Sequence, residues 1–584
     1  MKRFIDSFVL LTFLAVALVG FSVQANAQWT WGRAASGGTV DCWPIATDNA
    51  GNIFTAGIAV YHASSLDFGT GVTIPPYSIG GAYQTLWVKY NHAGIPQWAG
   101  GTSFGSTNIF NICTDPSGNL ILFGSFTSAT MTIGSFTLTN AYGTTSAAQY
   151  FLAKLDPSGT VLWAINDGNI NPSYFTIQTA FILSAGGVAT DAAGNIYITS
   201  SFNKRTMTIG TTTLTNADTS GSTYDIFVAK YTPAGVPVWA SSIGGLRNDY
   251  GFGITVASTG YVYITGTFYS PTFSVGSGTL ANPSVAPTIP YVYPYAYIAK
   301  FSSAGVPVWA QGEGGTRGAF GVGIAHDIYG NVYMTGGFAD STITFGSVTV
   351  GRTLGTAGND ALYLVQYSSA DVVTWYKSIS SSNRCYGYSV ALTGCGQVWV
   401  SGNYLADADV DGHTLALVAG ADPVFVAGYD LSTGVVGYSG LGSGGDDQNG
   451  IACDDSGNVY LASDFFGDSL FVGHDTVWAT GGGSEHLYIA KYANASCTPT
   501  KTPALPYKKY INIYPNPASN TISVVTSETV GKIEIMDVYG KRVIVKSVNQ
   551  PEMTVDIHTL PRGIYFAVWL DGSGGRTTQK LVVE

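Results

Sequence analysis

The sequence predicts an all-β protein, and three of its features support this. Charged residues make up only 10% of the 584 residues, against about 25% in an ordinary soluble domain. Polarity comes instead from glycine, serine, threonine, asparagine and tyrosine, which favour short strands and tight turns. A turn sequence also recurs along most of the chain. The net charge of −11 argues against nucleic acid and anionic membrane surfaces as partners.

The N-terminus predicts a signal peptide over residues 1–27. Two basic residues at the start precede an apolar run over residues 8–20, and Ala25-Asn26-Ala27 has the small-x-small pattern of a cleavage site. An uncleaved membrane anchor is the alternative, but a span needs about 20 apolar residues. We therefore expect an exported mature chain that begins at Gln28 and has no transmembrane span.

Residues 28–494 are predicted to form a repeat domain with three markers. The first marker is a turn of the form Gly-Asn-apolar-aromatic, the second is an Ala-Lys-Tyr triplet, and the third is a tryptophan that opens the next strand. Self-similarity of this kind indicates a repeat architecture. Copies of the turn begin at Gly51, Gly194, Gly330 and Gly457, and looser copies begin at Gly118, Gly260 and Gly396, which makes seven.

Each repeat has the pattern of four strands, because β-branched and aromatic residues alternate between turns closed by Asp or Gly. Four-stranded units repeated around an axis are typical of a β-propeller, which allows about four to eight blades. An open β-solenoid is the alternative, but its repeats are shorter. We therefore expect a seven-bladed β-propeller.

The two ends of the repeat domain are predicted to share a blade. The last unit, Gly450 to Tyr492, lacks its tryptophan strand, whereas the mature chain begins with the unassigned strand Trp29-Thr30-Trp31-Gly32. The N-terminal strand is therefore expected to complete the last blade and remove the free sheet edge.

Residues 29–492 resemble a known repeat family. The combination Gly-Ile-Ala-x-Asp, Gly-Asn-Val-Tyr-x-Thr-Gly, Phe-Gly, Ala-Lys-Tyr and Val-x-Trp-Ala is similar to the bacterial SBBP repeat, a seven-bladed β-propeller repeat. Blade six departs from it, with Gly428 in place of the lysine and Gly437-Tyr438 in place of the tryptophan pair. The resemblance implies a fold and says little about activity.

A linker is predicted over residues 495–507, which are rich in proline and threonine. Charge also changes there. Residues 28–500 carry 13 basic and 28 acidic residues, a net of −15, whereas residues 501–584 carry 10 and 7, a net of +3. These observations place a domain boundary at the linker.

Residues 508–584 are predicted to form a small Ig-like β-sandwich, because alternating strands are separated by Gly and Pro turns. Their motifs resemble the type A sorting domain of the type IX secretion system of Bacteroidota. An ordinary Ig-like binding module is the alternative. The resemblance implies as sorting-signal residues Pro515, Asn516, Pro517, Gly540, Gly563, Tyr565 and Lys580.

The sorting-domain resemblance also implies partners and a location. The secretion machinery and its sortase would recognise the domain at the outer membrane and remove it. The remaining protein would then be released or attached to surface lipopolysaccharide. We expect a secreted or cell-surface protein that passes through the periplasm.

No catalytic motif stands out in the sequence, and no cofactor is expected. The seven histidines form no HExxH, and Gly-x-Ser-x-Gly and Walker loops are absent. His326 is interpreted as a satisfied polar residue of an inner strand. Asp407, Asp409 and Asp411 resemble a calcium loop, but Val418 stands where a bidentate Glu is needed.

Several loop residues are candidates for ligand binding. Asp249, Arg317, Asp446 and Asp447 are expected in equivalent loops that enter the first strand of their blades. Solvated loop charges are the alternative interpretation. An insertion before a third strand contains Tyr291, Tyr293 and Tyr295, which could stack on sugar rings or a partner surface, or face the neighbouring blade.

The cysteines are too few for a disulfide scaffold. Cys42 and Cys497, near the two ends of the repeat domain, are predicted to form a disulfide that staples its closure. Cys113 and Cys453 are expected to be buried free thiols.

Three functional hypotheses follow. The first is a non-catalytic, monomeric binding or adhesion module for a polysaccharide or surface protein. The second is an extracellular carbohydrate-active enzyme, a hydrolase or lyase with its site in the propeller channel. Asp115, Asp191, Asp327 and Asp454 recur in the repeats, which favours a turn role over a single active site. The third is a structural coat component.

Overall fold

The all-β prediction is confirmed by a computed structural model. It describes residues 29–493, 497 and 511–584, except for short gaps at 61, 63, 78–82, 104–105, 142–147, 171–185, 277, 283, 285–291, 316, 356–358, 419–422, 443–448, 474, 480–484, 515, 527–530, 549–551 and 572–575. The predicted signal peptide lies outside the described residues. Every regular element within them is a β-strand. The chain divides into two compact units, Met1–Pro499 and Thr500–Glu584.

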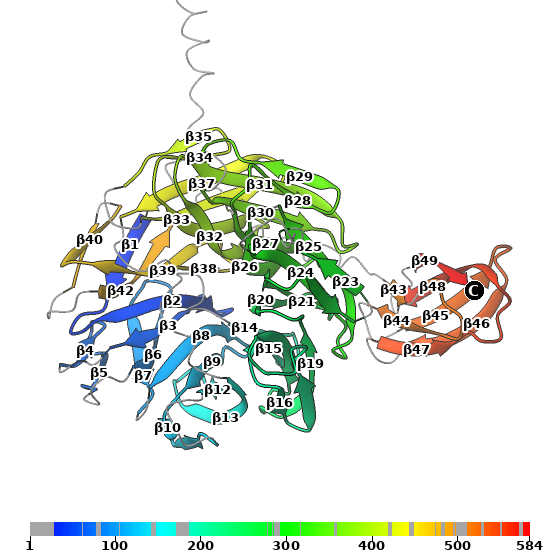
Figure 1. The fold of residues 1–584 in the computed structure, drawn as a ribbon, viewed down its shortest axis with the longest axis horizontal. Helices are drawn as coiled ribbons and strands as arrows, with labels where there is room; N and C mark the ends of the chain where they lie inside the picture. Colours follow the sequence, from blue (N-terminus) through cyan, green and yellow to red (C-terminus); the bar gives the residue numbers. More distant parts are fainter. Residues whose placement is uncertain are drawn as a thin grey trace, which may run out of the picture. The chain divides into compact units, whose positions relative to one another are not determined.

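Unit one contains seven antiparallel groups of four strands within its described residues, called sheets 1 to 7 (Figure 1). Sheet 1 contains β2 (Val40–Thr47), β3 (Ile53–Ala59), β6 (Gln84–Tyr90) and β7 (Pro96–Gly101), and sheet 2 contains β8 (Thr107–Thr114), β9 (Leu120–Phe126), β12 (Ala148–Leu155) and β13 (Val161–Ile170). Sheet 3 contains β14 (Gly186–Thr190), β15 (Ile196–Phe202), β18 (Asp225–Tyr231) and β19 (Pro237–Ile243). Sheet 4 contains β20 (Asp249–Val256), β21 (Val262–Phe268), β24 (Tyr295–Phe301) and β25 (Pro307–Gly314). Sheets 5 and 6 are β26 (Ala319–His326), β27 (Val332–Phe338), β30 (Ala361–Tyr367), β31 (Val373–Ser381); and β32 (Cys385–Leu392), β33 (Val398–Tyr404), β36 (Val424–Asp430), β37 (Gly434–Leu441).

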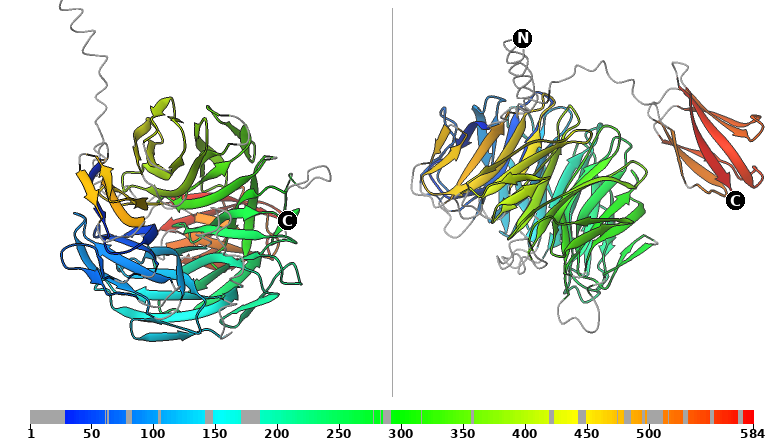
Figure 2. Two further views of the ribbon diagram at one scale, coloured as in Figure 1. Left: turned by 60° about the vertical axis from the view of Figure 1, so that its left-hand side comes forward. Right: turned by 90° about the horizontal axis from the view of Figure 1, so that it is seen from above.

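Sheet 7 combines the two ends of unit one. Its strands are β38 (Gly450–Cys453), β39 (Val459–Phe466), β42 (Glu485–Tyr492) and the N-terminal β1 (Trp29–Ala34). Strand β1 pairs antiparallel with β42, with Trp31 opposite Lys491. Figure 2 shows the blue β1 among the orange strands of this sheet.

The first strands of consecutive sheets contact one another in the order β2, β8, β14, β20, β26, β32 and β38, and β38 in turn contacts β2. Hydrophobic clusters lie between neighbouring sheets. One of them joins Val40 and Ile53 of sheet 1 to Tyr460 and Ile489 of sheet 7. Each sheet therefore buries both faces against its neighbours.

A short hairpin follows the second strand of each sheet. Two hairpins extend the sheet before them, since β28 pairs with β25 and β34 pairs with β31. The hairpins are β4 (Leu66–Asp67) and β5 (Thr73–Ile74), β10 (Thr130–Ile133) and β11 (Phe136–Thr139), β16 (Thr206–Ile209) and β17 (Thr212–Thr215), β22 (Thr272–Val275) and β23 (Gly278–Ala281), β28 (Thr342–Phe345) and β29 (Val348–Gly351), β34 (Ala408–Val410) and β35 (His413–Leu415), and β40 (Ser469–Val472) and β41 (Asp475–Trp478).

The repeat markers hold adjacent sheets together. The indole Nε1 of Trp98 and the Nζ of Lys89 both donate to the carbonyl oxygen of Pro157, at 3.0 and 2.9 Å. That carbonyl lies in the next sheet, in a turn where Gly159 faces Trp98 so closely that a Cβ would come within 2.9 Å of the ring. Trp31 takes the equivalent place over Gly94, so β1 acts as the tryptophan strand of sheet 7.

The recurring aspartates cap the turns between first and second strands, which confirms their predicted turn role. Asp327 accepts hydrogen bonds from the backbone N–H groups of Tyr329 and Asn331, both at 2.9 Å, and from Asn331 Nδ2 at 2.7 Å. Similar bonds from the Asn four residues later are accepted by Asp48, Asp115, Asp191 and Asp454.

Removal of one such cap is expected to destabilise unit one modestly. Asp327→Ala leaves several turn donors without their acceptor, so we expect a loss of about 1–3 kcal/mol. The measurement is the urea midpoint of unfolding. Asp327→Asn keeps one acceptor oxygen and is expected to lose less. Equal midpoints for Asp327→Ala and the wild type would contradict the capping role.

Unit two contains two antiparallel sheets. One is β43 (Ile511–Tyr514), β44 (Thr521–Thr526) and β47 (Glu552–Asp556). The other is β46 (Arg542–Val548), β45 (Gly531–Asp537), β48 (Gly563–Asp571) and β49 (Arg576–Val583). Its core includes the fully buried Ile533 and Trp569.

Candidate functional site

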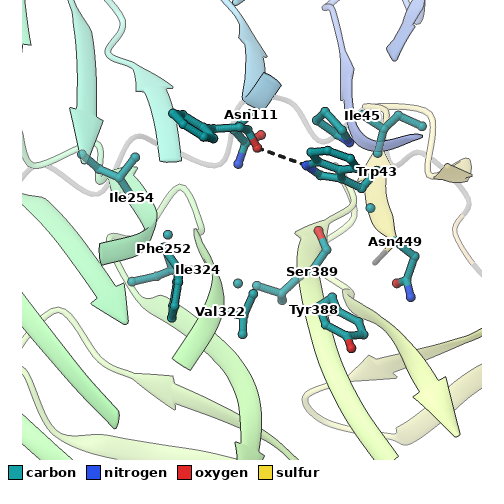
Figure 3. A pocket seen from close by; sticks show the side chains of 16 residues that line it. Trp43, Ile45, Asn111, Phe252, Ile254, Val322, Ile324, Tyr388, Ser389 and Asn449 are labelled. Carbon is teal, nitrogen blue, oxygen red and sulfur yellow. Dashed lines mark hydrogen bonds between the residues drawn. The ribbon is translucent and has the colours of Figure 1, made fainter. Parts of the chain in front are cut away.

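A pocket of about 120 Å³ lies among the first strands of six sheets (Figure 3). Two or three residues of each of β2, β8, β20, β26 and β32 line it, together with the start of β38. The lining residues are Trp43, Pro44, Ile45, Phe110, Asn111, Phe252, Gly253, Ile254, Val322, Gly323, Ile324, Tyr388, Ser389, Val390, Asn449 and Gly450.

Local irregularities in the first strands position this lining. The pairing register shifts between Ile109 and Asn111 in β8, and equivalent shifts occur in β2, β20, β26 and β32. Bulges of this kind re-aim side chains and often lie next to functional sites. The residues that the pairing skips, including Phe110, Phe252, Val322 and Tyr388, all line the pocket.

The described lining is mostly apolar, with aliphatic and aromatic side chains, and none of its residues is charged. Trp43, Phe110, Phe252 and Tyr388 are each less than 10% exposed. The polar side chains are Asn111, Ser389 and Asn449.

The amide groups of the lining are partly satisfied. The backbone N–H of Ile112 donates to Asn111 Oδ1 at 2.8 Å, which leaves the Asn111 amino group for other partners. Asn449 Nδ2 donates to Asn403 Oδ1 at 2.6 Å, whereas Asn449 Oδ1 is buried without a hydrogen-bond partner. The pocket therefore combines mainly apolar walls with a few polar uncharged side chains, which suits an uncharged ligand.

No acidic side chain is found among the described residues that line the pocket. A glycoside hydrolase normally needs two carboxyl groups on either side of the scissile bond, and the pocket lining has none. His326, at the end of β26, accepts or donates a hydrogen bond at 2.8 Å with Thr255 Oγ1. This confirms its interpretation as a satisfied residue. Burial lowers the pKa of the His326 imidazole, so it is neutral at neutral pH.

None of the predicted ligand-loop residues that the structure describes lines this pocket. Asp446, Asp447 and Tyr291 lie outside the described residues. Arg317 is exposed, with its Nε 4.0 Å from Asp340 Oδ1. Tyr293 is 37% exposed.

The other two predicted ligand-loop residues are at least partly covered. Tyr295 is half-buried, with its ring edge against Phe268. Asp249 is fully buried at the start of β20, which differs from its predicted place in an exposed loop.

Asp249 instead organises a buried turn. Its carboxylate accepts hydrogen bonds from Ser270 Oγ and the Gly245 N–H, both at 2.8 Å. Burial, and to a lesser extent the charge of the neighbouring Asp225, raise the pKa of Asp249 to about 7. Burial also raises the pKa of Asp225 to about 7.

The stability of unit one is expected to fall as the pH rises between about 4 and 7. A carboxyl whose pKa is higher in the folded than in the unfolded state keeps its proton better when the protein is folded. Its contribution to the free energy of unfolding is therefore lost as the pH rises from the unfolded-state pKa through the folded-state pKa. Since the pKa of each carboxyl rises from 3.8 to about 7 and one pKa unit corresponds to about 1.4 kcal/mol, we expect a decline on the order of 4 kcal/mol per carboxyl, measured by urea unfolding.

The Asp225→Asn variant tests whether the two buried carboxyls cause this pH dependence, because it removes one of them. It is expected to flatten the pH dependence, whereas Asp67→Asn at an exposed position leaves it unchanged. A pH profile of Asp225→Asn identical to that of the wild type would show that the decline has another origin.

The predicted disulfide between Cys42 and Cys497 is wrong. Cys497 is bonded to Cys395, with a Cα–Cα distance of 6.0 Å and a sequence separation of 102 residues. Cys42 is a buried free thiol whose Sγ lies 2.9 Å from Thr55 Oγ1. The end of sheet 7 is therefore stapled to sheet 6, because Cys395 lies in the turn between β32 and β33. Cys113 and Cys453 are free, as predicted, and half-buried.

The calcium-like loop does not form a shared site. Asp411 pairs with Lys377 Nζ at 2.6 Å, Asp409 accepts the Gly412 N–H, and Asp407 accepts the Leu417 N–H. The part of the chain that the structure describes contains no group of three or more acidic, histidine or cysteine residues that could hold a metal ion.

The predicted sorting-signal residues that the structure describes have structural roles in unit two. Asn516 Nδ2 donates to the Lys580 carbonyl at 2.7 Å and Asn516 Oδ1 accepts the Val582 N–H at 2.8 Å, which ties residues 516–518 to β49. The Asn516–Pro517 peptide bond is cis. Pro515 lies outside the described residues.

The remaining sorting-signal residues lie in β48, in β49, which contains Lys580, and in the turn after β45. Tyr565 is buried, and its hydroxyl donates to the Pro561 carbonyl at 2.8 Å. Gly540 has a φ of +80° in a turn capped by Asp537, and Gly563 is the first residue of β48.

A family model described as a secretion system C-terminal sorting domain matches residues 512–584. A curated relative, an uncharacterized WD repeat-containing protein of Acanthamoeba polyphaga mimivirus, is 23% identical over 440 residues, which are 67% of this chain and 31% of the relative. The matched region thus spans about a third of the length of that relative.

Solved structures show distant similarity. PorZ, an essential surface component of the type-IX secretion system of Porphyromonas gingivalis, matches with a TM-score of 0.24 and 10% identity over 92% of this chain and 70% of PorZ. A protein of unknown function from Dyadobacter fermentans matches with a TM-score of 0.34 and 9% identity over 80% of this chain and 99% of its own. A polysaccharide lyase of family PL25, an ulvan lyase, matches with a TM-score of 0.25 and 10% identity over 84% and 92%. No functional residue is transferred from these structures.

The sorting domain establishes where the protein acts. It indicates export through the type IX secretion system to the cell surface or the medium, and it implies an interaction with that secretion machinery. None of the described residues forms a helix that is long and apolar enough to span a membrane.

Proposed function

We propose that residues 28–494 form a seven-bladed β-propeller and act outside the cell as a non-catalytic binding module. Sheets 1 to 7 would be its blades, and β1 would close the last one. The series of first-strand contacts from β2 through β38 and back to β2 supports this arrangement. The WD repeats named in the curated relative are also propeller repeats.

The proposal extends to the C-terminal segment. Residues 508–584 would form an Ig-like sorting domain, joined through the linker at 495–507 and removed by the sortase of the secretion system after export. The resemblance of its motifs to type A sorting domains supports this. The mature propeller would then be released or attached to the surface.

The uncharged lining of the pocket among the first strands is the observation that carries the binding role. Four aromatic, six aliphatic and three polar uncharged side chains line it, and none of these described residues carries a carboxylate. The ligand would be a glycan or a surface protein that inserts an uncharged group. The enzyme and coat-protein hypotheses have no comparable support among the described residues.

The test uses the full secreted chain. It is incubated with a panel of polysaccharides and bacterial surface proteins, and both retention and release of new reducing or unsaturated ends are measured. We expect retention without product. Ser389→Phe, which fills the pocket, should abolish binding, and Ser389→Ala should preserve it. Product release, or equal binding by Ser389→Phe, would refute the proposal.

A further inference from the structure

The outward face of the β40–β41 hairpin carries two exposed aromatic side chains. Phe471 is 74% exposed and Trp478 is 66% exposed. Phe471 pairs with Thr476 and Trp478 pairs with Ser469. Because paired residues project to the same side of a hairpin, aromatic rings and hydroxyl groups alternate on one face.

The sister hairpins show that this face does not need aromatic residues to fold. The buried face is apolar in each of them, as it is at Leu470 and Val472. The positions equivalent to Phe471 are Thr132, Thr208, Ser274 and Thr344, and those equivalent to Trp478 are Thr139, Thr215, Ala281 and Gly351.

Cross-strand hydroxyl contacts replace the aromatic residues in those hairpins. Thr132 and Thr137 lie 3.3 Å apart through their Oγ1 atoms, and Thr344 and Thr349 lie 3.1 Å apart. Only the buried positions are alike between these hairpins and β40–β41. The two rings of β40–β41 therefore expose apolar surface that the fold does not require.

The size and charge of the patch indicate its ligand. An aromatic side chain contributes about 150–250 Å², so the two exposed rings offer about 300 Å² together, well below the roughly 800 Å² per partner of a stable protein interface. Residues 28–500 carry a net charge of −15, which disfavours anionic ligands. Alternating rings and hydroxyls instead match a sugar, whose C–H face packs on an aromatic ring while its hydroxyls form hydrogen bonds.

We propose that the β40–β41 hairpin is a second binding site, separate from the pocket, for a neutral polysaccharide chain. Phe471 and Trp478 would stack on sugar rings, and Ser469 and Thr476 would contact their hydroxyls. This inference rests on the proposed role of the protein as a binding module, and it names an uncharged glycan as a ligand class.

The test compares three variants of the full secreted chain with the wild type. The double variant Phe471→Thr, Trp478→Thr carries threonine at both positions, as the β10–β11 and β16–β17 hairpins do, so it is expected to fold. Thr208→Ala with Thr215→Ala changes the same positions of another hairpin. Ser389→Phe fills the pocket. The probes are insoluble cellulose, starch granules and soluble laminarin, with alginate as an anionic comparison.

We expect the wild type to bind at least one neutral probe, with quenching or enhancement of its tryptophan fluorescence. The hairpin variant should bind it about tenfold more weakly, which corresponds to about 1.4 kcal/mol, and the Thr208/Thr215 variant should bind as the wild type does. Failure to bind any neutral probe would overturn the inference, as would unchanged binding by the hairpin variant or equal, hairpin-dependent binding of alginate.

Two outcomes separate this site from the pocket. If Ser389→Phe loses binding while the hairpin variant keeps it, the hairpin inference fails and the pocket proposal stands. If only the hairpin variant loses binding, the pocket proposal fails and the hairpin inference stands. Light scattering that shows a dimer which the hairpin variant dissociates would make a second copy the occupant and would also overturn the inference.

Discussion

Loss of the Cys395–Cys497 disulfide is expected to lower the stability of unit one by about 4–5 kcal/mol, since a cross-link that closes a loop of about 100 residues contributes roughly 4.7 kcal/mol through the entropy of the unfolded chain. The bridge spans 102 residues, which include all of β33 through β42. The variant is the double substitution Cys395→Ser, Cys497→Ser. Replacing both cysteines avoids leaving one of them as a free thiol.

The folded structure gives the bridge a second role. Cys497 follows β42 and packs on the turn before β39, where a Cβ on Gly457 would come within 2.1 Å of the Cys497 Sγ. The bridge therefore holds the end of sheet 7 against the β32–β33 turn of sheet 6. We expect the loss of stability to be accompanied by faster proteolysis of the β38–β42 region.

Reduction provides the control for this prediction. Dithiothreitol should lower the thermal midpoint of the wild type to that of the double variant, and it should leave the variant unchanged. A wild-type midpoint that does not respond to reduction would contradict the stabilising role of the bridge.

The repeat was predictable because its markers act over short distances. The Asp–Asn turn cap lies within five residues, so the hydrogen bonds of Asp327 with residues 329–331 can be inferred from their spacing. The Ala-Lys-Tyr and tryptophan markers are also readable, since Lys89 and Trp98 face each other on adjacent strands. What these markers bind, the Pro157 carbonyl of the next sheet, could not be read from one repeat alone.

The pocket and the disulfide were harder to predict for a physical reason. The pocket depends on residues that the pairing skips in five of the first strands, and the signal is no more than a large residue between small ones, as in Gly251-Phe252-Gly253. The disulfide depends on which turn lies beside Cys497 in space. Cys395 is 102 residues away from it in sequence, so no local pattern distinguishes it from Cys42.

The aromatic hairpin was also missed, although the repeat itself contains the signal. Alignment of β40–β41 with β10–β11 and β16–β17 places Phe471 and Trp478 where the other hairpins have threonine. Exposure distinguishes these rings from core aromatics, and exposure is a property of the fold. Trp29, a buried ring that packs in one cluster with Leu470 and Val477 of this hairpin, has the opposite role.

Truncation of Trp29 is expected to cost about 3–5 kcal/mol, as is usual when a large buried aromatic side chain is replaced by alanine. Trp29 is 5% exposed, and its ring meets the edge of Tyr492 with centroids 5.3 Å apart. Its Nε1 donates to Ser439 Oγ at 2.9 Å. Ser439 belongs to sheet 6, so this side chain joins the N-terminal strand to two sheets at once.

Two variants separate these contributions in urea unfolding. Trp29→Phe keeps most of the packing and loses the N–H, so it is expected to cost about 1 kcal/mol beyond the small change in volume. Trp478→Ala removes a ring that is 66% exposed and is expected to change stability by less than about 0.5 kcal/mol. If Trp29→Ala were as stable as Trp478→Ala, β1 could not be an integral strand of sheet 7, and the closure of the propeller by the N-terminal strand would have to be abandoned.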